Sequence, residues 1–204
     1  MNNRNIDINL IFPTPIWTTI LPDFEQINIR MIKYIDGLKN TDPVGKKKSN
    51  LIGWHSHSFN LQDSDPKFFV NSISPMLNES LTDMGWDLKK NILKITSMWT
   101  IINPTNASNS RHIHSNNFIS AAYYIKSPEN SGNIVFHDPR SAKVIMSPLI
   151  GTSNKLNSTI FSVTPKEGLL VLFPSYLHHS VEINNSDSER IVISFNLNLI
   201  EKSN

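Results

Sequence analysis

The sequence contains no cysteine. This absence excludes disulfides, thiolate metal sites and cysteine nucleophiles, so a metal ion would have to be bound by His, Asp, Glu, Asn or water. No run of eighteen apolar residues occurs, and the apolar part of the N-terminal stretch MNNRNIDINLIFPTPIW is broken by Pro13 and Pro15. We therefore expect neither a membrane span nor a signal peptide, and a soluble cytoplasmic protein.

Net charge is also small. The 19 Lys and Arg residues and 17 Asp and Glu residues leave a formal charge of +2, which makes nucleic acid an unfavoured partner. The basic run KKK at 46–48 is typical of a solvated loop. With 204 residues, 39% of them hydrophobic, the chain can form one sizeable core and is too apolar for a disordered protein. We expect a single domain over residues 1–204.

Helical periodicity is confined to residues 1–90. Apolar residues recur at helical intervals between Ile27 and Leu38, which predicts one amphipathic helix. A second helical pattern covers 65–86, and Pro75 inside it should kink or split the helix. We interpret residues 1–90 as a helical preface that supports the rest of the chain from outside.

From residue 91 to residue 200 the pattern changes to short strands separated by turn residues. The apolar or alternating segments are ILKITSMWTIIN, FISAAYYI, GNIVF, VIM, STIFSV, GLLVLF, SVEI and RIVISFNLNLI. About eight to ten short strands at this density are typical of a sandwich or barrel of the jelly-roll type. The fold class is therefore α+β, mainly β, with the candidate site in the β part.

The candidate site begins with two histidines in NSRHIHSNNFISAAYY, His112 and His114. In an extended strand alternate side chains leave by the same face, so this pair could hold a metal ion from one side. A second pair, His178 and His179, lies in FPSYLHHSVEI, and Arg190 follows His179 by eleven positions. Together these residues could complete a metal site with a nearby anion-binding group.

The register of the last strand bears on the choice between His178 and His179. If residues 184–187 form a four-residue hairpin loop, position 179 pairs with 192 and position 181 with Arg190. His179 then faces the same way as Arg190 and Ser194, because directly paired residues share a face. A loop one residue longer would favour His178 instead.

A rival H-x-H pair, His55 and His57, occurs in SNLIGWHSHSF. It lies beside Gly53 and Trp54 in a loop-like context without a long strand pattern, whereas a metal site needs rigid support. We interpret this segment as a structural or substrate-facing loop. His137 and His178 are interpreted as structural residues.

Five segments carry a family resemblance: SNLIGWHS, MWTIIN, NSRHIHSNNFISAAYYI, SGNIVFHDPR and EGLLVLFPSYLHHSVEINNSDSERIVISFN. In order and spacing they resemble small 2-oxoglutarate- and Fe(II)-dependent oxygenases of bacteria and of viruses that infect marine cyanobacteria. The resemblance implies a double-stranded β-helix (a cupin-like jelly-roll) over 91–200 behind the helical preface. It also implies a dioxygenase, expected to hydroxylate an unidentified substrate, that uses Fe(II), 2-oxoglutarate and dioxygen; a bacteriophage protein of this kind would act in the host cytoplasm.

The resemblance assigns roles to individual residues. His112 and His179 would bind the iron, and Arg190 would bind the distal carboxylate of 2-oxoglutarate as a planar charged fork. Ser194 and Tyr124 would add hydrogen bonds to that carboxylate.

One position departs from the usual pattern of this superfamily. The second member of the strand pair is usually a carboxylate, as in H-x-D or H-x-E, but here it is His114. A three-histidine site is one reading, and it raises the net charge at the iron by one unit. In another, His114 is the first ligand, with Asn116 or water in place of the carboxylate. Asp138 in HDPR could also reach the metal, although a turn role beside Pro139 and Arg140 is favoured.

Two rival functions stay open at this stage. A cupin-like metalloenzyme or isomerase would use the histidines without 2-oxoglutarate, and a non-catalytic jelly-roll module of a virus particle would use neither. The sequence names no primary substrate and leaves a homodimer open.

Overall fold

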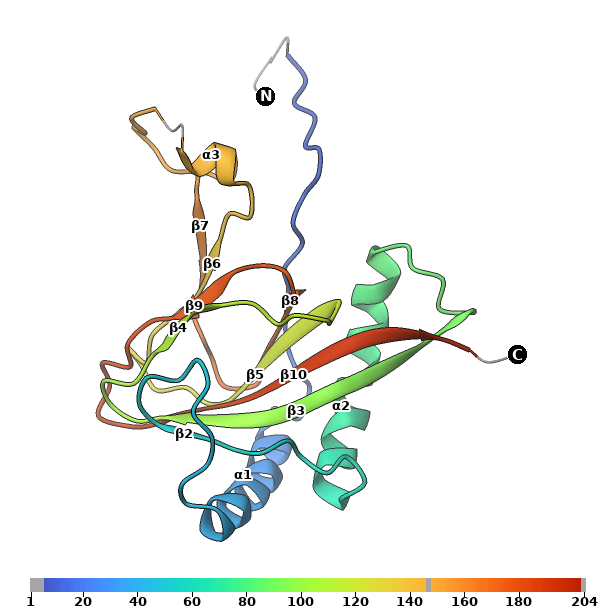
Figure 1. Cartoon of the computed structure of the whole chain (residues 1–204), viewed down its shortest axis with the longest axis vertical. Coiled ribbons are helices and arrows are strands. Elements are labelled where there is room, and N and C mark those ends of the chain that lie inside the picture. The colour runs from blue at the N-terminus through green and yellow to red at the C-terminus, as the bar shows by residue number, and fades with distance from the viewer. Residues whose placement is uncertain (1–5, 146–147, 203–204) are drawn as a thin grey trace.

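The structure, a computed structural model, describes residues 6–145 and 148–202 and is built around two antiparallel β-sheets (Figure 1). The six-stranded sheet has the order β1 (Trp17–Ile20), β8 (Leu169–Pro174), β5 (Ile119–Lys126), β10 (Arg190–Glu201), β3 (Asn91–Asn103) and β2 (Trp54–His55). The four-stranded sheet has the order β4 (Asn109–His112), β9 (His179–Val181), β6 (Ile134–His137) and β7 (Ile160–Val163). The prediction of a mainly β chain is confirmed.

Two long helices pack on the outer face of the six-stranded sheet, α1 (Phe24–Thr41) and α2 (Ser64–Asp83). Their apolar positions, at helical spacing, bury one stripe of each helix against the strands. The shared cluster includes Met31, Ile35, Phe69, Ile73, Leu77, Tyr123, Ile193 and Phe195. Asn28 ties α1 to the sheet because its amide donates to the carbonyl of Ile125 (2.8 Å) and its side-chain oxygen accepts from Tyr123 (2.7 Å).

Pro75 lies within α2 and does not split it, so that part of the prediction is wrong. Pro75 is exposed, and its missing N–H therefore costs a hydrogen bond only on the solvent side of the helix. Ile73 and Leu77, on either side of it, remain buried against the sheet. Packing on the sheet compensates for the interruption.

A second apolar cluster occupies part of the space between the two sheets. It contains Ala122, Tyr124, Ile134, Phe136, Leu169, Val171, Phe173 and Leu177. Strand β5 is buried on both faces, because alternation sends Tyr123 toward the helices and Tyr124 toward the second sheet. The six-stranded sheet is therefore a wall supported from both sides.

The connection from β9 to β10 differs from the predicted hairpin. Strand β9 pairs with β4 and β6, whereas β10 pairs with β3 and β5, so residues 182–189 cross from one sheet to the other. Buried Asn184 holds this crossing: its backbone N–H donates to the carbonyl of Ala107 (2.9 Å), and its amide donates to those of Asn103 (2.9 Å) and Ser188 (2.8 Å). The predicted hairpin register, including the pairing of 181 with Arg190, is wrong.

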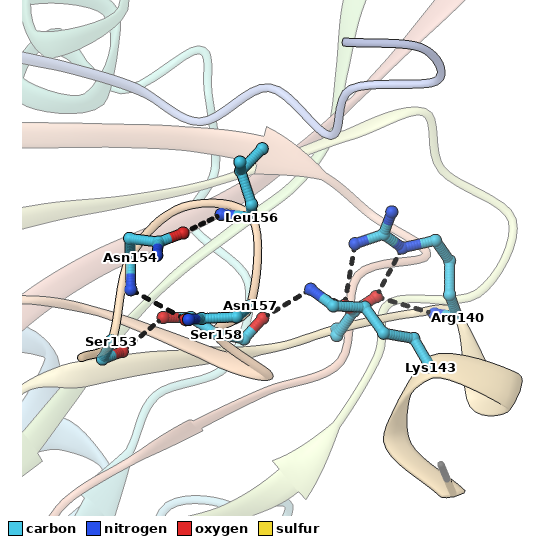
Figure 2. A network of polar contacts seen from close by, with 8 residues as sticks. Arg140, Lys143, Ser153, Asn154, Leu156, Asn157 and Ser158 are labelled. Carbon is cyan, nitrogen blue, oxygen red and sulfur yellow. Dashed lines mark hydrogen bonds and ion pairs between the residues drawn. The ribbon is translucent and has the colours of Figure 1, made fainter. Parts of the chain in front are cut away.

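A strand predicted for the segment VIM is also wrong as far as the described residues reach, because residues 141–145 form the short helix α3 (Ser141–Ile145) and Met146 lies outside them. The side chain of Asp138 stabilises the turn that leads into α3. It accepts from the backbone N–H of Arg140 (3.0 Å), from the guanidinium of Arg140 (3.0 and 2.9 Å) and from the ammonium of Lys143 (3.1 Å). Lys143 also donates to the carbonyl of Ser158 (2.8 Å), which joins this turn to the polar loop 153–158 (Figure 2).

None of the helices in the described ranges is both long enough and apolar enough to cross a membrane.

Candidate active site

Three histidines meet where the four-stranded sheet faces the six-stranded one. His112 ends β4, His179 begins β9, and the two are directly paired across these strands. His114 follows β4 by two residues, and its backbone N–H donates to the carbonyl of Ser175 (3.1 Å). Each of the three offers a ring nitrogen, and these nitrogens all lie within 4.8 Å of one another.

Backbone carbonyls fix the orientation of two of the three rings. Nδ1 of His112 lies 2.7 Å from the carbonyl oxygen of Ser110, and Nδ1 of His179 lies 2.9 Å from that of Leu177. Because a carbonyl can only accept, both Nδ1 atoms carry the proton and both Nε2 atoms keep a free lone pair. This is how proteins prepare imidazoles for a metal ion.

Burial keeps the three imidazoles neutral. Burial, with a smaller contribution from the neighbouring His112, lowers the pKa of His114 to about 4 and that of His179 to about 3. The pKa of His112 is also lowered by burial, although its hydrogen bond to Ser110 opposes this shift. At neutral pH the cluster therefore presents unprotonated nitrogens, the form that binds metal ions.

The triad opens into a pocket of about 590 Å³ between the sheets. One wall of the pocket is formed by alternate residues of the two longest strands, β3 and β10, whose side chains lie on the same face of the sheet. Their lining residues are Ser97, Trp99, Ile101, Asn103, Arg190, Val192, Ser194 and Asn196. The paired register places Arg190 opposite Asn103 and Ser194 opposite Trp99, so these side chains share one face of the sheet.

Arg190 is a buried cation in this wall, with 1% of its surface exposed. Its Nη1 donates to the carbonyls of Ser131 and Gly132, the latter at 3.0 Å. Its Nη2 is buried and has no hydrogen-bond partner among the described residues. Leaving a buried charged donor unpaired costs more than about 1–3 kcal/mol, so this nitrogen fits an anionic ligand in the pocket.

Tyr124 is fully buried beside Arg190 and lines the same pocket. Burial raises the pKa of its hydroxyl to about 12, against the opposing effect of the Arg190 charge. The phenol therefore stays protonated and can donate a hydrogen bond at neutral pH.

Trp99 and Asn103 also have unpaired polar atoms in this pocket. The Trp99 ring stacks on His55 (centroids 5.7 Å apart, interplanar angle 9°) and lies 5.6 Å from the ring of His114. Its Nε1 is buried without a partner in the described part of the chain, as is Oδ1 of Asn103. Neither residue was assigned a role from the sequence, although their alternation along the strand placed both on one face.

The other candidates from the sequence lie outside the histidine cluster. Asn116 is exposed, with its carbonyl bonded to Asn198 (2.9 Å), and Asp138 is held by Arg140 and Lys143 as described above. His137 contacts the hydroxyl of Ser180 (3.0 Å), and the backbone carbonyl of His178 accepts from the N–H of His137 (2.9 Å).

The rival H-x-H pair is split by the structure. His55 is buried and lines the pocket, whereas His57 is exposed, 3.5 Å from Asp42. The pair therefore does not present two ligands to one metal ion.

Two sheets that enclose a histidine triad and a buried arginine define a candidate metal site with a neighbouring anion-binding group, and comparison with known proteins indicates which class of protein has such a site. Residues 97–196 match the family model described as "Putative 2OG-Fe(II) oxygenase". Over these residues the chain matches a family of 2-oxoglutarate- and Fe(II)-dependent oxygenases, enzymes whose co-substrates are 2-oxoglutarate and dioxygen. No curated protein sequence matches it.

Solved structures with the same fold include three prolyl hydroxylases. A Pseudomonas putida prolyl-4-hydroxylase is 12% identical, with a TM-score of 0.60 and 94% of each chain covered. A Trichoplax adhaerens prolyl hydroxylase, solved with a hypoxia inducible factor peptide fragment, is 13% identical (TM-score 0.61; 89% of this chain and 82% of that chain). The viral collagen prolyl hydroxylase of Paramecium bursaria Chlorella virus-1, solved with 2-oxoglutarate, is 11% identical (TM-score 0.54; 89% and 94%).

Proposed function

We propose that this oxygenase binds Fe(II) through His112, His114 and His179 and binds 2-oxoglutarate through Arg190. The observation that carries this assignment is the unpartnered Nη2 of Arg190, buried in the wall of the pocket that holds the triad. A five-carbon diacid can place its keto acid end on a metal ion while its far carboxylate meets a guanidinium. Ser194 and Tyr124, which line the same wall, would add hydrogen bonds to that carboxylate.

We also propose that the two sheets form a double-stranded β-helix of the jelly-roll type in a single domain over 1–204, with residues 1–90 as a helical preface that also contributes the edge strands β1 and β2. The two apolar clusters on opposite faces of the six-stranded sheet support this description, because the two long helices pack on one face of that sheet and the four-stranded sheet packs on the other.

The three histidines and Arg190 would have separate roles in the reaction. Fe(II) with 2-oxoglutarate and dioxygen supplies oxidation of an unactivated C–H bond, coupled to decarboxylation of the keto acid. The three neutral imidazoles would hold the metal without offsetting its charge, whereas the usual carboxylate ligand removes one unit. Arg190 would hold the co-substrate in one orientation, and the walls of the pocket would limit the entry of water.

The test is anaerobic titration of the protein with Fe(II) and then 2-oxoglutarate. We expect one iron per chain and the visible absorption band of an Fe(II)–keto acid chelate. His112→Ala and His179→Ala should each abolish iron binding. Tight iron binding without a chelate band at millimolar 2-oxoglutarate would favour a cupin-like metalloenzyme, and full-affinity iron in both variants would disprove the assigned site.

A further inference from the structure

Two lysines reach the pocket from the connection between α1 and β2, which Figure 1 shows in blue to cyan. Lys46 and Lys48 both line the pocket, whereas Lys47 between them does not. Lys46 is half-buried, and Lys47 and Lys48 are exposed. The backbone around these residues is irregular and non-helical. The basic run therefore contains two residues that line the pocket and one that does not.

Hydrogen bonds fix the segment at both ends. On one side the N–H of Lys46 donates to the carbonyl of His55 (2.8 Å), the last residue of β2. On the other side the N–H of Lys48 donates to the side chain of Asn50 (2.9 Å), and Asn50 forms a β-bridge with Asn109 of β4. The lysines are thus held beside the strand that ends in His112.

The positive charge at this end of the pocket is not balanced by protein. None of the described residues that line the pocket is acidic, and the ion pairs formed among the described residues do not involve Lys46 or Lys48. Burial lowers the pKa of His55, which lines the same pocket, and the charges of both lysines act in the same direction. A dianionic 2-oxoglutarate would offset the metal ion, which leaves these lysines without a counter-charge.

We propose that Lys46 and Lys48 bind an oxyanion group of the primary substrate, a carboxylate or a phosphate, at the mouth of the pocket. This inference rests on the proposed function, because it reserves the metal and Arg190 for the co-substrate. Lysine suits such a group as a flexible point charge with three donors. The substrate class is therefore a small anionic molecule with the reacting carbon on the side that faces the histidine triad.

The test uses protein loaded with redox-stable Mn(II) and saturated with 2-oxoglutarate. Inorganic phosphate is titrated and its ³¹P line broadening by the paramagnetic ion is measured; acetate, followed by its methyl proton line, distinguishes a carboxylate from a phosphate site. We expect broadening by at least one of the two probes. Lys46→Ala and Lys48→Ala should each weaken the binding of that probe about two- to tenfold, and the double variant should abolish it.

Lys47→Ala is the matched control and should leave the broadening unchanged, while Lys46→Arg should retain it because the charge is kept. Broadening that persists in the double variant, equal loss in Lys47→Ala, or no broadening by either probe would overturn the inference. So would a higher requirement for 2-oxoglutarate in the lysine variants, which would assign the lysines to the co-substrate. A missing chelate band in the iron protein would instead defeat the proposed function itself.

Discussion

Arg190 combines nearly complete burial with one nitrogen that has no partner among the described residues. Losing a buried charge-assisted pair costs on the order of 2–5 kcal/mol, or roughly thirty-fold to several-thousand-fold in affinity. Arg190→Ala should therefore leave iron binding intact and raise the 2-oxoglutarate concentration needed for the chelate band by that factor. Arg190→Lys should lie between the two, because it keeps the charge and loses the fork.

Anaerobic absorption titration of the iron-loaded variants measures this effect, and bound iron per chain is the control. The same band at the same 2-oxoglutarate concentration in Arg190→Ala would contradict the assignment.

His114 occupies the place where related sites usually have a carboxylate. Since its ring nitrogen lies within 4.8 Å of those of His112 and His179, we expect His114→Ala to lose iron as severely as His112→Ala. His114→Asp should retain iron by restoring the common donor set. Iron content after anaerobic loading checks both outcomes, and a His114→Ala protein that keeps its iron but loses turnover would place His114 outside the coordination sphere.

The connection between β5 and β6 supports Arg190 from behind through the carbonyls of Ser131 and Gly132. Gly132 has a φ of +86°, and an added Cβ would lie 2.6 Å from the carbonyl oxygen of Glu182. Gly132→Ala should therefore displace this connection, lower the free energy of unfolding by about 1–3 kcal/mol and weaken 2-oxoglutarate binding.

Denaturant unfolding and the chelate titration measure the two effects of Gly132→Ala separately. Gly37→Ala is the control: Gly37 lies inside α1 with open space around it, so alanine should stabilise the helix by up to about 1 kcal/mol without changing the titration. Wild-type stability in Gly132→Ala would show that the connection adapts and does not fix Arg190.

The sequence predicts where helices and strands occur better than it predicts which strands pair with each other. The 3.6-residue period locates α1 and α2, and the period of two in β3 and β10 places Trp99, Arg190 and Ser194 on one face. Strand partners depend on contacts remote in sequence. The hairpin register predicted for His179 does not occur. His179 is buried because β9 lies between β4 and β6 in the other sheet.

The same limit applies to the roles of two polar segments. Asn184 has the chemistry of a turn residue, yet its amide bridges backbone groups at the crossing between the two sheets. The lysine run at 46–48 lies in a largely exposed loop, as the sequence predicts, but composition does not reveal that Lys46 and Lys48 line a pocket. Its proximity to the SNLIGWHS segment was the available signal.

In the whole molecule, the pocket lies between two sheets of unequal support. The six-stranded wall is packed on both faces, by the helices and by the second apolar cluster. Within the described ranges, the edge strand β7 leaves Ile160 and Phe161 about half exposed (56% and 52%), so the four-stranded sheet is less supported at this edge. The wall that holds Arg190 is therefore the more completely packed side of the site.

A ligand that binds only the folded chain raises the free energy of unfolding, so the melting temperature of the protein can be used to detect binding at the site. A ligand at a hundred times its Kd stabilises by about 2.7 kcal/mol, which for a chain of 150–250 residues raises Tm by roughly 5–10 °C. We expect Mn(II) alone to raise Tm, 2-oxoglutarate alone to change it little, and the two together to raise it most, because the keto acid end needs the metal. His112→Ala should remove both increments and Arg190→Ala only the second, as measured by thermal unfolding followed by circular dichroism. An equal shift with 2-oxoglutarate in the absence of metal would mean that the diacid binds away from the triad.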